Sequence, residues 1–131
     1  KRFLSNFICL LFQQIVLIFM YKIKKRLVIS AAHQLKLDYE SKCSVLHGHN
    51  WIIDVYLRSK ELDANGMVYD FTQIKKRIHD KLDHKILNDV LPFNPTAENI
   101  AYWVVQELAP YCYRADVEES PDNSASYELD D

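Results

Sequence analysis

Glycine is scarce in this sequence. Only Gly48 and Gly66 occur among its 131 residues. The nucleotide-binding loops of Rossmann and P-loop proteins need several closely spaced glycines, because their backbone must come close to a phosphate group. The sequence therefore excludes both of these nucleotide-binding classes.

Cysteine and net positive charge are also scarce. The three cysteines, Cys9, Cys43 and Cys112, are an odd number without the paired spacing of a disulfide framework or a zinc knuckle, which favours a reducing setting. The 16 basic and 18 acidic residues give a formal net charge of -2, whereas nucleic-acid-binding surfaces are basic. We therefore expect a cytoplasmic protein with no nucleic-acid partner.

Length and composition are those of a single folded domain. Hydrophobic residues make up 49% of the chain and charged residues 26%, which is ordinary for a globular protein. A chain of 131 residues is long enough for one hydrophobic core and too short for two.

The first 19 residues differ from the remainder. A basic start is followed by an apolar stretch at residues 7–19, interrupted by two glutamines, which resembles a signal peptide or a membrane anchor. We interpret residues 1–19 as an extension upstream of a natural start at Met20. A single domain then spans residues 20–131, and no membrane partner is expected. A membrane or export segment and an additional packed helix are the alternatives.

Two alternating segments predict strands that carry histidines. Residues 21–33 and 45–60 alternate apolar and polar side chains, and residues two apart in a strand share a face. His33 ends the apolar face of the first segment, and His47 and His49 begin the buried face of the second. If the two strands pair in antiparallel fashion, the three imidazoles lie together on the side of the sheet that helices cover.

The middle of the chain predicts a turn and two helices. The Asn-Gly pair that ends at Gly66 is a tight-turn signal, because such turns need positive φ angles, and a short third strand at residues 67–69 should follow. Asp70 is placed to cap a first helix and Thr96 to cap a second. In each case the following apolar residues recur at helical spacing.

The C-terminal part predicts further β-structure. Residues 113–119 are predicted to form a fourth strand, and residues 125–129 a short continuation beyond a turn. The order of elements predicts an α+β fold, in which an antiparallel four-stranded sheet carries both helices on one face. Glu118 and Glu119 lie on opposite faces of the fourth strand, so at most one of them points into a site.

The three histidines are candidate metal ligands. Three imidazoles suit Zn²⁺ and leave one tetrahedral position open for water or substrate, which is the catalytic arrangement. Cys43, four residues before His47, could instead close the shell as a fourth ligand, and the zinc would then be structural. The spacing leaves both arrangements open.

Asp83 and the adjacent His84 are weaker candidates. A general base needs a partner that orients its imidazole, and a nearby cysteine could be activated by the same pair. Two adjacent charged residues at the end of a helix are also common on solvated surfaces. The pair gains interest only if it lies near the other candidate residues.

From Met20 to about Tyr127 the sequence resembles the family of 6-pyruvoyl-tetrahydropterin and 6-carboxy-tetrahydropterin synthases. Six motifs, in the same order along the chain, carry the resemblance. They are Ser30-Ala31-Ala32-His33, Cys43-x-x-x-His47-Gly48-His49-Asn50, Gly66-Met67-Val68-Tyr69-Asp70-Phe71, Leu82-Asp83-His84-x-x-Leu87-Asn88, Pro95-Thr96-Ala97-Glu98-Asn99 and Val117-Glu118-Glu119-Ser120.

The resemblance implies a tunnelling fold (T-fold), whose subunits join their sheets into a barrel, usually as a homohexamer of two trimers. The residues at the family's zinc-binding positions are His33, His47 and His49. Those at its catalytic positions are Cys43, as base or proton donor, with Asp83 and His84 as the proton relay. The residue at its pterin-anchoring position is Glu119.

The implied substrate is a pterin. The short spacing from Cys43 to His47 resembles the bacterial 6-carboxy enzymes, because the animal 6-pyruvoyl enzymes have a longer insertion there. The implied reaction is that of a lyase, which converts 7,8-dihydroneopterin triphosphate to 6-carboxy-5,6,7,8-tetrahydropterin, acetaldehyde and triphosphate in queuosine biosynthesis. The alternatives are the 6-pyruvoyl activity, a non-catalytic zinc-binding or pterin-binding module, and a membrane-tethered form that uses residues 7–19.

Overall fold

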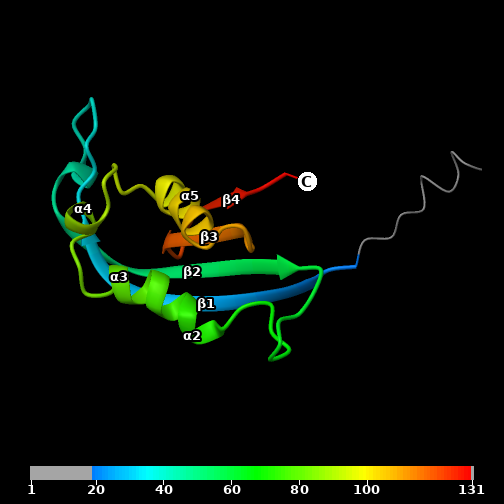
Figure 1. Ribbon diagram of the computed structural model, residues 1–131. Coiled ribbons are helices and arrows are strands. Elements are labelled where there is room, and N and C mark those ends of the chain that lie inside the picture. The colour runs from blue at the N-terminus through cyan, green and yellow to red at the C-terminus, as the bar shows by residue number, and fades with distance from the viewer. Residues whose placement is uncertain (1–18, 131) are drawn as a thin grey trace, which may run out of the picture.

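The computed structural model describes residues 19–130, so the interpretation of residues 1–18 lies outside the described part. Within it, four strands form one antiparallel sheet in the order β1-β2-β3-β4 (Figure 1). They are β1 (Tyr21–His33), β2 (His47–Ser59), β3 (Cys112–Ser120) and β4 (Asn123–Glu128). Each strand pairs with the next one along the chain.

Helical segments fill the connections between strands. They are the 3-10 turn η1 (Lys42–Ser44), α2 (Phe71–Ile74), the π-helical turn η2 (Lys75–His79), α3 (Asp80–Leu82), α4 (Leu87–Val90) and α5 (Ala97–Glu107). The predicted caps are confirmed, because the Asp70 carboxylate accepts the N–H of Thr72 at 2.8 Å and the Thr96 hydroxyl accepts that of Asn99 at 3.1 Å. Among residues 19–130, no helix combines the length and apolar character needed to cross a membrane.

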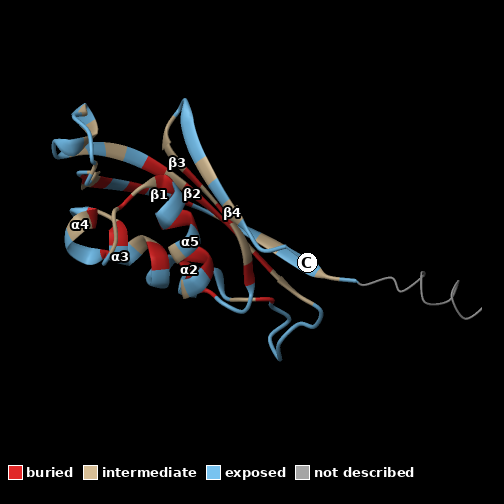
Figure 2. Ribbon diagram, turned by 90° about the horizontal axis from the view of Figure 1, so that it is seen from above, coloured by how far each residue is buried: buried red, intermediate tan, exposed pale blue. Residues whose placement is uncertain are grey.

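One face of the sheet packs against these helices. In the pairing of β1 with β2, His33 lies opposite His47 and Ile29 opposite Trp51, so the odd-numbered residues of both strands share this face. Helix α5 packs against β3 and β4, while η2 and α3 pack against β1. The side chains between the two layers form one buried core, which Figure 2 shows along the strands and the inner sides of the helices. The predicted α+β architecture is confirmed.

The predicted third strand at residues 67–69 is wrong. These residues follow a turn, in which the N–H of Asp63 donates to the carbonyl of Met67 at 2.9 Å and Gly66 has a φ of 80°. Val68 enters the core from this non-strand segment.

The last strand of the described sheet is β4, which the sequence predicted only as a short continuation. It pairs with β3 from Asn123 to Glu128.

Candidate functional site

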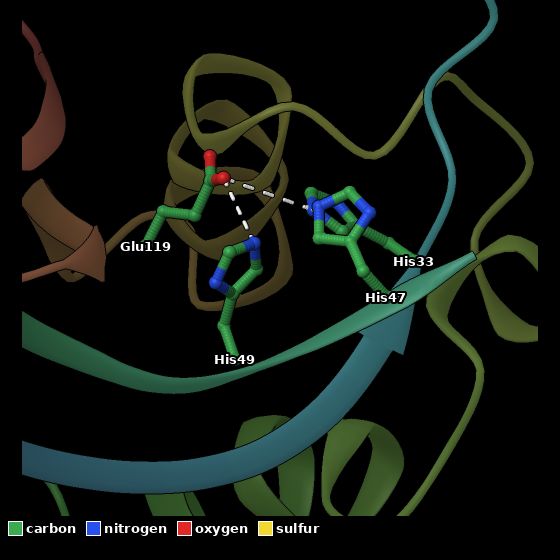
Figure 3. Close-up of side chains that lie close together, drawn as sticks. All are labelled: His33, His47, His49 and Glu119. Carbon is green, nitrogen blue, oxygen red and sulfur yellow. Dashed lines mark hydrogen bonds and ion pairs between the residues drawn. The ribbon is translucent and has the colours of Figure 1, made fainter. Parts of the chain in front are cut away.

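Three histidines and a glutamate meet at one end of the sheet (Figure 3). The strand register brings the histidines together, because His33 lies opposite His47 and Ala31 lies opposite His49. Glu119 reaches the group from the end of β3. The ligand atoms of the four side chains all lie within 4.8 Å of one another. We call this group the histidine cluster.

The donor atoms of the histidine cluster are close enough to share one ion. His33 Nε2 lies 3.1 Å from His47 Nε2 and 3.9 Å from Glu119 Oε1, which is also 3.0 Å from His49 Nε2. The His33 side chain is fully buried, whereas those of His49 and Glu119 are 21% and 22% exposed. The cluster is therefore closed around His33 and open to solvent beside His49 and Glu119.

Backbone carbonyls orient two of the imidazoles. His33 Nδ1 lies 2.8 Å from the carbonyl oxygen of Pro95, and His47 Nδ1 lies 2.6 Å from that of Val45. A carbonyl oxygen only accepts hydrogen bonds, so both Nδ1 atoms carry a proton and donate it. In neutral imidazoles both Nε2 atoms then present lone pairs to the cluster. Burial lowers the pKa of His33, which favours this neutral form.

The electrostatics of the cluster fit a metal cation. The lone pairs of His33 Nε2 and His47 Nε2 face each other over 3.1 Å, an arrangement that a shared cation would stabilise. His49 Nε2 is buried and, although Glu119 is near, makes no hydrogen bond with residues 19–130. Such an atom is costly unless something binds it. Imidazole and carboxylate are ligands of Zn²⁺ in proteins, so the cluster could hold a metal ion of this kind.

Trp51 forms the inner wall of the cluster. Its ring centroid lies 4.9 Å from that of His33 and 5.4 Å from that of His49, in both cases nearly edge-on. Its indole N–H donates to the carbonyl of Ala31 at 3.2 Å, and the side chain is almost fully buried. Trp51 therefore restricts both imidazoles and keeps water from their inner side. The sequence placed Trp51 on the buried face, but not beside the cluster.

Cys43 lies in η1 and is partly buried. Within residues 19–130, Cys43 Sγ is not among the possible ligand atoms that lie within 4.8 Å of one another. Its carbonyl accepts the N–H of Leu35 at 2.8 Å, and its own N–H donates to the Ser41 hydroxyl at 3.1 Å. The bond from Leu35 ties Cys43 to the segment that leaves β1 at His33. Its role, as catalyst or as ligand, stays a prediction.

Asp83 and His84 lie against the edge of β1. The N–H of Ser30 donates to Asp83 Oδ1 at 3.0 Å, which lowers the pKa of Asp83, and the N–H of His84 donates to the carbonyl of Ser30 at 2.7 Å. Asp83 Oδ2 lies 2.8 Å from His84 Nδ1, and the His84 ring is largely exposed. A groove of about 550 Å³ is lined by both His49 and His84. Of the pair, His84 therefore shares a groove with one member of the cluster, His49.

Comparisons with known proteins agree with this geometry. A protein-family model described as 6-pyruvoyl tetrahydropterin synthase matches residues 22–130. The chain is 30% identical to the 6-carboxy-5,6,7,8-tetrahydropterin synthase of Bacillus subtilis, with 82% of this chain and 84% of that protein covered. It is 36% identical to the protein of the same name from Synechocystis, with 82% and 93% covered.

A solved structure has the same fold. That of Caenorhabditis elegans 6-pyruvoyl tetrahydropterin synthase superposes with a TM-score of 0.68 and 29% identity, and covers 86% of this chain and 98% of that one. The family match covers nearly all of the described residues and includes every member of the histidine cluster. The chain therefore belongs to the 6-pyruvoyl tetrahydropterin synthase family.

Proposed function

We propose that this chain is a zinc-dependent carbon–carbon lyase. Its reaction would convert 7,8-dihydroneopterin triphosphate to 6-carboxy-5,6,7,8-tetrahydropterin, with release of acetaldehyde and triphosphate, in a pathway to queuosine and other deazapurines. The observation that carries the proposal is the histidine cluster, with Glu119 at its open side. The names of the Bacillus and Synechocystis relatives support the 6-carboxy product.

The imidazoles of His33, His47 and His49 would hold the zinc ion. Bound zinc would supply Lewis acidity toward oxygen atoms of the substrate side chain. The chain itself orients the ligands, because the carbonyls of Pro95 and Val45 each accept a hydrogen bond from an Nδ1–H group. Such outer contacts fix the ring and the tautomer of a metal-binding histidine.

The remaining residues would bind the pterin and move protons. The Glu119 carboxylate can pair with the amino group and a ring N–H of the pterin, a bidentate geometry with strong directional preference. Cys43 would act as base or proton donor at the substrate side chain. Asp83, held by the N–H of Ser30, orients His84 through Nδ1 and so leaves His84 Nε2 to exchange protons in the groove.

Turnover of dihydroneopterin triphosphate by the purified, zinc-loaded protein tests the proposal. We expect acetaldehyde, measured through NADH oxidation by alcohol dehydrogenase, in step with triphosphate. Cys43→Ala should lower turnover by about 10²–10⁴-fold while zinc content is kept, because proton transfer is lost. Ser44→Ala, an exposed position in the same turn, is the matched control and should retain activity. A wild-type protein that releases no acetaldehyde would contradict the proposal.

Two other functions make different predictions in the same assay. The 6-pyruvoyl activity, which the name of the Caenorhabditis elegans structure suggests, would release triphosphate without acetaldehyde. In a non-catalytic zinc-binding or pterin-binding module with Cys43 as fourth ligand, Cys43→Ala would lose zinc and stability instead of turnover. The three residues that separate Cys43 from His47 favour the 6-carboxy enzyme.

We also propose that copies of the chain assemble through their sheet edges. β1 and β4 are the edge strands of the described sheet, and open edges tend to be paired or covered. The expected assembly is a homohexamer of two trimers, in which the sheets join into a barrel. Native mass spectrometry would show a hexamer mass, and a monomer at working concentration would contradict this assembly. The cytoplasmic setting stays a prediction from the cysteine content.

A further inference from the structure

We propose that Asn88 and Asn94 are positioning residues for Cys43, which act through the segment that follows β1. The inference rests on the proposed catalytic role of Cys43. The segment, residues 34–36, leaves the sheet after His33 and belongs to no strand of the described sheet. Its backbone groups pair with partners other than a neighbouring strand.

Two side-chain amides take the place of a neighbouring strand. The N–H of Gln34 donates to Asn88 Oδ1 at 2.9 Å, and Asn88 Nδ2 donates to the carbonyl of Gln34 at 2.8 Å. The N–H of Lys36 donates to Asn94 Oδ1 at 2.9 Å, and Asn94 Nδ2 donates to the carbonyl of Lys36 at 3.0 Å. Asparagine can do this because its amide carries both a donor and an acceptor, as the backbone does. We call the pair the amide clamp.

The opposite side of the same segment holds Cys43. In an extended chain, successive backbone N–H groups point in opposite directions. Leu35, between the two clamped residues, donates its N–H to the carbonyl of Cys43 at 2.8 Å. A displacement of Leu35 therefore moves the backbone of Cys43 directly.

Asn94 also connects this segment to the histidine cluster. The next carbonyl, that of Pro95, accepts a hydrogen bond from His33 Nδ1 at 2.8 Å. The carbonyl of Asn94 is itself held by the Thr96 N–H at 2.8 Å and by Asn99 Nδ2 at 3.0 Å. One anchored dipeptide thus fixes the His33 ring and the backbone that supports Cys43. The clamp therefore sets where Cys43 lies relative to the cluster.

Alkylation of Cys43 by iodoacetamide tests the clamp without any turnover. The reaction is followed on the Cys43 peptide by mass spectrometry. Burial raises the pKa of Cys112 to about 11, so that thiol reacts slowly and serves as the internal reference. Asn88→Ala and Asn94→Ala should each speed Cys43 alkylation about fivefold, because the freed segment opens more often.

Asp70→Ala is the control for a general loss of stability. It removes the cap of α2, whose carboxylate accepts the Thr72 N–H, and touches neither residues 34–36 nor Cys43. It should leave the alkylation rate within twofold of the wild type, since its effect is confined to the helix end. If an alanine variant of the clamp does not fold, the isosteric Asn88→Asp and Asn94→Asp variants replace the donor by an acceptor and should change the rate in the same direction.

Kinetics give a second readout that a purely structural role would not produce. The clamp variants should lower kcat by about 10²-fold with KM and zinc content nearly unchanged, because a misplaced reacting group costs rate rather than binding. If Cys43 is alkylated at the wild-type rate in both clamp variants, the proposal is overturned. An inactive wild-type protein would instead refute the proposed function, and the alkylation rates would still decide on the clamp.

Discussion

His49→Leu should stabilise the metal-free protein and destabilise the zinc-loaded protein. His49 Nε2 is buried without a hydrogen bond to residues 19–130, while the ring packs near Trp51 at 5.4 Å between centroids. Leucine keeps an apolar side chain of similar size there and removes the unsatisfied nitrogen. It also removes a proposed zinc ligand. The sign of the stability change should therefore depend on the metal.

The two effects can be sized separately. A buried polar atom without a partner costs about 1–3 kcal/mol. Glu119 Oε1, 3.0 Å from Nε2, offsets part of this cost, so we expect a gain of about 1 kcal/mol without metal. With zinc at roughly a thousand times its Kd, binding contributes about 4 kcal/mol to the wild type, most of which the variant should lose. The expected change with zinc is thus a loss of about 2–4 kcal/mol.

Urea unfolding with chelator and with zinc, followed by tryptophan fluorescence, measures both values. His79→Leu is the control, because His79 lies on η2 with its Nδ1 3.0 Å from Asp80 and is not part of the histidine cluster. Its effect should be the same in both conditions. An equal destabilisation by His49→Leu with and without zinc would refute the reasoning, since His49 would then be neither a ligand nor an unsatisfied group.

Two further predictions concern carboxylates. Asp54→Asn should destabilise the protein by about 1–2 kcal/mol at pH 7, because Asp54 accepts two hydrogen bonds from Arg26, at 2.8 and 3.0 Å, which lower its pKa. This contribution is complete above the ordinary aspartate pKa of about 4 and is lost as the pH falls through the lower folded-state pKa. The free energies of unfolding of variant and wild type should therefore converge toward about pH 3. A difference that stays constant with pH would contradict this prediction. Glu119→Gln should raise KM for the pterin about tenfold or more and keep zinc, because an amide offers one acceptor oxygen instead of two. Loss of zinc from that variant would make Glu119 a ligand instead.

The alternation of side chains along the strands accounts for most of what the sequence predicts about the site. Alternation in β2 fixes the face that His47 and His49 share, and antiparallel pairing then places His33 beside them. The same alternation places Glu118 and Glu119 on opposite faces of β3. The approach of Glu119 to His49 depends on the register between β2 and β3, whose residues are far apart in the sequence, so the sequence pattern alone does not predict a shared ligand group.

The wrong strand at residues 67–69 and the underestimated length of β4 have one physical cause. The apolar run at residues 67–69 has the composition of a strand, but a strand also needs a partner, and here the chain turns and sends Val68 into the core. Residues 123–128 include serines and are mostly exposed, so they lack a strong apolar alternation. Their strand conformation comes from pairing with β3, which is a tertiary interaction.

The Asn94-Pro95-Thr96 tripeptide shows where rigidity at the site comes from. The side chain of Asn94 holds Lys36, the carbonyl of Pro95 holds His33, and the hydroxyl of Thr96 caps α5. Only the cap can be predicted from residue type, because every residue has the same carbonyl group. Helix α5 is anchored in turn by packing against β3 and β4. The orientation of a buried imidazole is therefore maintained by hydrophobic burial of a helix that contributes no ligand, and core changes on α5 can reach the site through one carbonyl oxygen.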